Sequence, residues 1–128
     1  MQLFSFIESP FPLALLDNLC DSLGIQTQHF SSSRKLIKAL KQTPPDFIFA
    51  EFLYGYSNNY AGVNISNLDV MLYAMQTSAK QTKVITVSQK EQQVHVAKLD
   101  AIFPIYGNLN WQTLKAGLPM LLKQAKDS

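Results

Sequence analysis

Four residues with reactive or ligand-forming side chains follow or close short apolar runs of the chain. They are, in chain order, Glu8, Ser9, Glu51 and Ser88. A pair of carboxylates can hold a divalent cation or exchange a proton, and a nearby hydroxyl can donate a hydrogen bond to either. Such chemistry requires a fold that brings these run ends together, so the elements that carry them have to be considered next.

The apolar runs alternate with stretches of helical periodicity along the whole chain. Strands are predicted at residues 2–7, 25–30, 46–51, 83–88 and 101–107. Helices are predicted at 10–24, 34–42, 64–79, 89–99 and 110–125, the last one bent at Pro119. Near-continuous apolar strands that alternate with helices are typical of a parallel sheet covered on both faces. We therefore predict one α/β domain over residues 1–128.

Pro104 indicates where the fifth strand lies. Proline has no N–H to donate to a ladder, so strand 101–107 is expected at a sheet edge or at a bulge. The flavodoxin-like order 2-1-3-4-5 places the fifth strand at an edge, and we predict this (βα)5 three-layer sandwich. Its ligands bind beyond the carboxyl ends of the strands. The residues expected there are Glu8, Ser9, Glu51, Phe52 and Ser88, with Ile105 and Tyr106 nearby.

On these features the chain resembles the receiver domain of bacterial response regulators, across nearly its whole length. The resemblance rests on the (βα)5 spacing, on Pro45 and Asp46 at the entry to the third strand, and on the residues at strand ends. It implies an acidic pair after strand one, a phosphoacceptor aspartate ending strand three, a Ser or Thr ending strand four and a Lys-Pro pair ending strand five. The corresponding residues are Glu8 and Ser9, Glu51, Ser88, and Ile105 and Tyr106.

Three departures from that pattern bear on phosphoryl transfer. Ser9 replaces a carboxylate, although Mg²⁺ favours carboxylate oxygens. Ile105 removes the fixed positive charge that would neutralise phosphoryl oxygens. Glu51 carries an extra methylene, which moves its carboxylate out of line with the remaining donors. We therefore expect a pseudo-receiver that is not an enzyme, is not phosphorylated and uses no cofactor.

Two interpretations of Glu51 remain open at this point. Its longer side chain could place negative charge near Ser88 and so mimic the phosphorylated state, or it could be a solvated carboxylate at a strand end. Glu8 and Glu51 should lie near each other, and close carboxylates repel unless a proton, cation or water separates them. A weak divalent site at this pair is left open, although no metal is expected.

An aromatic group follows the third strand and is expected at the same end of the sheet. Its members are Phe52, Tyr54, Tyr56, Tyr60 and, from a neighbouring loop, Tyr106. Aromatic residues with polar tips suit recognition surfaces, but they would equally serve as a lid over a closed phosphorylation pocket.

The receiver resemblance also implies a surface for association. This surface is the face of the fourth helix, fifth strand and fifth helix, where His95 and Tyr106 would contribute and a homodimer could form. The helix at 89–99 is thinly apolar, with Val94, Ala97 and Leu99 as its apolar side. Neither His29 nor His95 has a partner at the sequence spacing of a catalytic triad or a metal site.

Composition narrows the classes of partner. The net charge of +2 is too small to indicate nucleic-acid binding, and the basic residues Arg34, Lys35, Lys38 and Lys41 read as a solvated helix face. No segment approaches the roughly 18 apolar residues of a membrane span. The single cysteine, Cys20, is expected to be buried and excludes an internal disulfide. We expect a cytoplasmic protein.

The leading hypothesis is a signalling module that acts through a signalling kinase, an output protein or a second copy of itself. The alternative is a small-molecule or nucleotide binder at the switch point of the sheet. Against a nucleotide, Pro10 and Pro12 remove two backbone donors from the first turn after strand one. The third hypothesis is a phosphoacceptor receiver with an altered site.

Overall fold

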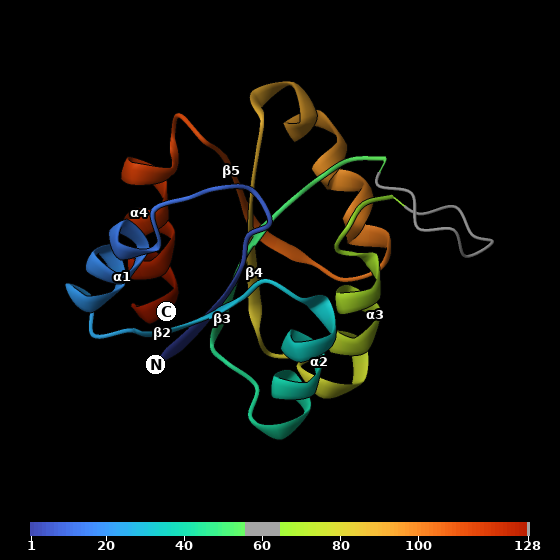
Figure 1. The fold of residues 1–128 in the computed structure, drawn as a ribbon, viewed down its shortest axis with the longest axis horizontal. Helices are drawn as coiled ribbons and strands as arrows, with labels where there is room; N and C mark the ends of the chain where they lie inside the picture. Colours follow the sequence, from blue (N-terminus) through green and yellow to red (C-terminus); the bar gives the residue numbers. More distant parts are fainter. Residues whose placement is uncertain (56–64, 128) are drawn as a thin grey trace.

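A parallel five-stranded sheet lies between two layers of helices in the computed structural model, which describes residues 1–55 and 65–127 (Figure 1). The strands are β1 (Gln2–Phe6), β2 (Gln26–Phe30), β3 (Phe47–Glu51), β4 (Lys83–Ser88) and β5 (Ile105–Asn110). The helices are α1 (Leu13–Asp21), α2 (Ser33–Gln42), α3 (Asp69–Ser78), the 3₁₀ helix η1 (Lys90–Ala101) and α4 (Leu114–Lys126). The strand order is β2-β1-β3-β4-β5, which confirms the predicted flavodoxin-like topology.

Each face of the sheet has its own apolar core. The period-two alternation of a strand sends Ile48 and Ala50 of β3 toward α2, α3 and η1, whereas Phe47 and Phe49 pack toward α1 and α4. Every residue of β3 is buried, as expected for the central strand of a covered sheet. No helix of the described residues is long and apolar enough to cross a membrane.

Ser32 and Gly24 have the helix-end roles that the sequence predicts. The Ser32 hydroxyl accepts a hydrogen bond from the Lys35 N–H at 3.4 Å and so begins α2. Gly24 follows α1 with a φ of 71°, a left-handed conformation that glycine adopts without strain. The four basic residues of α2 are exposed, as predicted, and Cys20 is fully buried.

The fifth strand is displaced from its predicted position. It was expected at 101–107, but β5 spans Ile105–Asn110, and the apolar residues Ile102 and Phe103 instead pack into the core before the strand begins. Pro104 therefore precedes β5 and lies outside the ladder. The edge position is confirmed, and a register shift between Val84 and Ile85 interrupts the β4–β5 pairing.

The segment after β4 also differs from its prediction. It is a 3₁₀ helix in which Val96 and Leu99 are buried, while Val94 is 74% exposed and Ala97 is exposed. Three residues per turn place positions i and i+3 on one face, which explains why Val96 and Leu99 share the buried side.

The last helix starts later than its prediction. Helix α4 begins at Leu114, and Pro119 lies inside it. Trp111, which was expected in this helix, lies in the preceding turn and packs against Phe11, with ring centroids 5.4 Å apart.

Candidate functional site

Glu51 ends β3 with its carboxylate held by the loop after β1. Oε1 accepts hydrogen bonds from the backbone N–H of Glu8 at 2.9 Å and of Ser9 at 2.8 Å. The Ser9 hydroxyl donates to Oε2 at 2.5 Å. Glu51 is only 2% exposed, so these three donors replace the water that an ionised carboxylate would otherwise need. We call Glu51, Glu8 and Ser9 the Glu51 clamp.

Asn67 extends the clamp toward α3. Its Nδ2 donates to Glu8 Oε2 at 2.8 Å and to the backbone carbonyl of Glu51 at 2.9 Å. Its Oδ1 accepts the N–H of Leu53 at 2.8 Å. Sequence reasoning missed Asn67, and the one available signal was an amide side chain just before a helix at the carboxyl end of the sheet.

The two earlier interpretations of Glu51 can now be compared with its surroundings. Its burial contradicts a solvated carboxylate. Glu51 pairs with Val87 of β4 and so shares its face of the sheet, whereas alternation turns Ser88 to the opposite face. The Ser88 and Thr86 hydroxyls are buried without a partner among the described residues. The observed geometry therefore gives no support to a carboxylate directed at Ser88.

The assignment of Ile105 and Tyr106 to the carboxyl end of the fifth strand is wrong. Ile105 begins β5 and pairs with Val84 near the start of β4, so both residues lie toward the amino end of the sheet. Tyr106 is half-buried there, and its hydroxyl donates to the Leu121 carbonyl at 3.3 Å. The error follows from the shifted boundary of the strand.

Asn110 occupies the carboxyl end of β5, opposite Ser88. Its Oδ1 accepts the N–H groups of Gln112 and Thr113, both at 3.0 Å, and its Nδ2 donates to Gln93 Oε1 at 3.0 Å. The carboxyl end of β5 thus holds a neutral amide that organises the β5–α4 turn. The loss of the receiver lysine stays a prediction.

The described residues of the aromatic group lie in different environments. Phe52 is fully buried because its N–H continues the pairing with β4, donating to Val87 O at 2.8 Å, and its ring turns into the core. The prediction of Phe52 as a surface residue is therefore wrong. Tyr106 lies at the other end of the sheet, and Tyr56 and Tyr60 lie outside the described residues.

Tyr54 and His95 form a stacked pair on the surface. Their ring centroids are 3.7 Å apart with an interplanar angle of 6°. Lys98 Nζ lies 4.7 Å from the Tyr54 ring centroid and donates to the Tyr54 hydroxyl at 2.9 Å. Tyr54 remains 40% exposed, so the stack presents an aromatic ring that is already held in place.

The residues of the clamp do not fit the Mg²⁺ of the receiver pattern. The Glu51 carboxylate is bound by protein donors, and one oxygen of Glu8 is bound by Asn67. Within residues 1–55 and 65–127, no three or more His, Cys, Asp or Glu side chains gather as metal ligands. The geometry gives no support to a site at Glu8 and Glu51, and the absence of metal stays a prediction.

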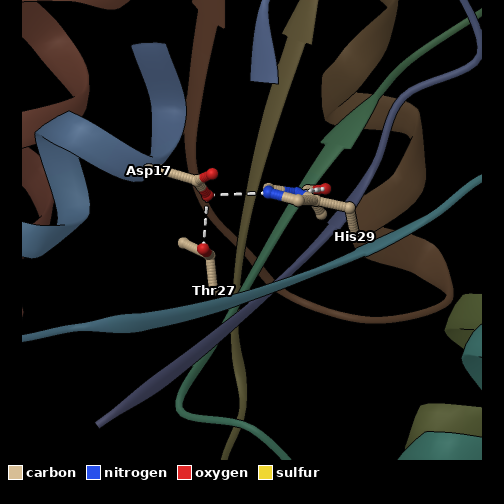
Figure 2. Close-up of polar contacts among 4 residues, drawn as sticks. Asp17, Thr27 and His29 are labelled. Atoms are coloured by element: carbon tan, nitrogen blue, oxygen red, sulfur yellow. Dashed lines mark hydrogen bonds and ion pairs between the residues drawn. The ribbon is translucent and has the colours of Figure 1, made fainter. Parts of the chain in front are cut away.

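A second polar network, which the sequence analysis missed, joins α1 to the sheet (Figure 2). His29 Nε2 lies 2.7 Å from Asp17 Oδ1, and His29 Nδ1 lies 2.6 Å from Ser5 Oγ. The Thr27 hydroxyl donates to the same Asp17 oxygen at 2.5 Å. The sequence spacing gave no sign of these partners, because tertiary packing brings Asp17 and Ser5 to His29.

The chemistry of this network is structural. Hydrogen bonds from Thr27 and His29, and the charge of His29, lower the pKa of Asp17, while burial opposes them. The ionised Asp17 makes Nε2 the protonated nitrogen, which leaves Nδ1 to accept from Ser5 when the ring is neutral. Ser5 is only 1% exposed beneath α1, so the Ser-His-Asp order does not present a nucleophile.

Solved structures of low sequence identity share this architecture. The signal receiver domain of an HD domain-containing protein from Pseudomonas fluorescens Pf-5 matches with a TM-score of 0.73 and 15% identity, over 98% of this chain and 94% of that chain. The fold is that of a response-regulator receiver domain. A CheY-like receiver domain from Methylobacillus flagellatus shares this receiver fold, with a TM-score of 0.69 and 16% identity over 97% of each chain.

A third receiver fold, a response regulator from Thermotoga maritima, matches with a TM-score of 0.69 and 12% identity over 99% of this chain and 98% of that chain. No family model matches the sequence, and no curated protein matches it. At these identities the similarity shows the fold alone, so the activity has to be argued from the residues.

Proposed function

We propose that the chain is a receiver-like signalling module that takes no phosphoryl group and acts by contact with a protein. The partner is a signalling kinase, an output protein or a second copy of the chain. The observation that carries the proposal is the Glu51 clamp, in which the side chain at the phosphoacceptor position is committed to the loop after β1.

The clamp opposes phosphoryl transfer in two ways. A carboxylate that accepts three hydrogen bonds has to give up part of this network before it can attack phosphorus, and its donors would then lose their partner. An acyl phosphate would also need nearby positive charge, and Asn110 supplies none at the end of β5. Glu8 is the single carboxylate at the two positions where receivers carry an acidic pair.

The Tyr54–His95 stack supports contact with a protein. Interface hot spots are enriched in aromatic side chains that are held in place before binding, because little conformational entropy is then lost. Tyr54 meets this description, with His95 on one side and Lys98 over its ring. The exposed Met120 of α4 adds support for the alternative of self-association through the η1, β5 and α4 face.

Incubation with acetyl phosphate and Mg²⁺, followed by intact-mass measurement, tests the first half of the proposal. We expect no gain of a phosphoryl group, while a phosphorylatable receiver domain treated in parallel gains one. The variant Glu51→Asp should also stay unmodified, because Ser9 and Asn110 are unchanged in it. A phosphorylated species of the unaltered chain, mapped to Glu51, would refute the proposal.

A further inference from the structure

A cavity of about 430 Å³ opens beside the Glu51 clamp. Its walls come from the carboxyl end of β1, the loop between β2 and α2, and the start of α3, and include Phe6, Glu8, Ser31, Ser33, Asn67 and Val70. This is the region outside the strand ends, next to the reversal of strand order between β1 and β3, where open α/β sheets bind ligands. The volume falls within the range of about 300–1,000 Å³ that is usual for small-molecule sites.

The cavity wall carries hydrogen-bonding capacity that its described neighbours leave unused. Glu8 Oε2 accepts from Asn67, but Oε1 has no hydrogen-bond partner among residues 1–55 and 65–127. Within the same residues the hydroxyls of Ser31 and Ser33 have no partner either. Each hydroxyl can donate and accept, and the free carboxylate oxygen accepts only.

The charge of the wall selects among ligand classes. None of the lining residues is a lysine or arginine, and the Glu8 carboxylate repels phosphate and carboxylate groups. A ligand with several hydroxyls can donate to Glu8 and exchange hydrogen bonds with the two serines, while Phe6 and Val70 offer apolar contact to its C–H groups. We propose that this cavity binds a neutral polyhydroxylated molecule of about monosaccharide size. The inference goes beyond the proposed function and does not depend on it.

Isothermal titration of the full chain with a small panel tests this assignment. The panel contains glucose, ribose and myo-inositol as neutral probes, glucosamine as a cationic probe, and glucose 6-phosphate as an anionic probe. We expect one-to-one binding of at least one neutral probe and weaker or absent binding of the phosphate. No heat with any neutral probe, or a preference for the phosphate, would overturn the proposal.

Two substitutions locate the site. Val70 is 53% exposed, so Val70→Trp should fold normally while its indole fills the cavity and abolishes binding. Tyr73→Trp places an indole one turn further along α3, outside the lining, and should bind as the unaltered chain does. Glu8→Gln removes the charged acceptor and should weaken a neutral probe about tenfold. Unchanged affinity in both Val70→Trp and Glu8→Gln would place the probe elsewhere and refute the inference.

Discussion

The Glu51 carboxylate is a buried charge whose contribution to the fold depends on the three donors around it. Hydrogen bonds that involve an ionised group are stronger than neutral ones, and leaving a buried partner unsatisfied costs more than the average bond contributes. The residue therefore joins β3 to the loop after β1, and the Asn67 amide adds a link to the residues before α3.

Replacement of Glu51 by glutamine should lower stability. The glutamine oxygen can keep both backbone N–H groups and its amide can donate to the Ser9 hydroxyl, but these bonds lose the charge that strengthens them, so we expect a loss of about 1 kcal/mol in the free energy of unfolding. Urea denaturation measures this loss, with the exposed residue Glu91 as the site of the matched control Glu91→Gln. Equal urea midpoints for Glu51→Gln and Glu91→Gln would contradict a stabilising role of the Glu51 clamp.

Asp17 makes stability depend on pH at the acid end. Its pKa is lowered from 3.8 in the folded chain, so its contribution is fully present above that value and is lost as pH falls through the lower folded pKa. We therefore expect Asp17→Asn to reduce the drop in unfolding free energy between neutral pH and pH values below about 4. Asp21→Asn, an exposed change on the same helix, is the control. If the unfolding free energies of both variants and the unaltered chain fell equally with pH, this role of Asp17 would be contradicted.

At the scale of elements, the alternation of apolar runs and helical stripes predicted a covered parallel sheet, and Pro104 in the fifth strand pointed to the flavodoxin-like strand order. The predicted bounds of β5 were wrong because the apolar run at 101–103 packs into the core before the strand. The strand itself contains the polar residues Asn108, which is exposed, and Asn110, which is buried. Among site residues, Glu8, Ser9 and Glu51 were correctly expected near one another. Their hydrogen bonds, like those of Asn67 and His29, depend on tertiary packing that a single sequence does not display.

Helix α4 approaches β5 closely at Gly117. A Cβ there would lie 2.6 Å from Leu109 Cδ2, although alanine favours a helix over glycine by about 1 kcal/mol. We expect Gly117→Ala to give no gain in the unaltered chain, and a gain of about 1 kcal/mol in a Leu109→Ala background where the contact is gone. Urea midpoints of the four proteins measure this coupling. The same gain in both backgrounds would show that the Leu109 side chain does not oppose a Cβ at position 117.

At the scale of the whole molecule, function is expected to depend on contacts between molecules. Tyr54 and Tyr73 are both exposed tyrosines, 40% and 58% respectively, but only Tyr54 is stacked and held by a lysine. The two residues therefore offer a matched comparison of an ordered aromatic side chain with an ordinary exposed one.

Tyr54→Ala should weaken association, while Tyr73→Ala should leave it unchanged. For a self-associating chain, light scattering over a range of concentrations measures the dimer constant, and loss of a hot-spot aromatic costs about 2 kcal/mol or more. For a different partner, the same pair of variants is compared by titration with the signalling protein that binds the unaltered chain. Equal effects of the two substitutions would remove Tyr54 from the contact surface.

The Glu51 clamp also has a consequence for the lifetime of the folded chain. Its hydrogen bonds join residues 42 and 43 positions apart, so they can form only after β1 and β3 have come together. Interactions that form after the rate-limiting step change the unfolding rate and leave the folding rate almost untouched. Glu51→Gln should therefore speed unfolding in stopped-flow measurements without slowing refolding. In that case the Glu51 carboxylate at the end of β3 would slow the opening of the sheet.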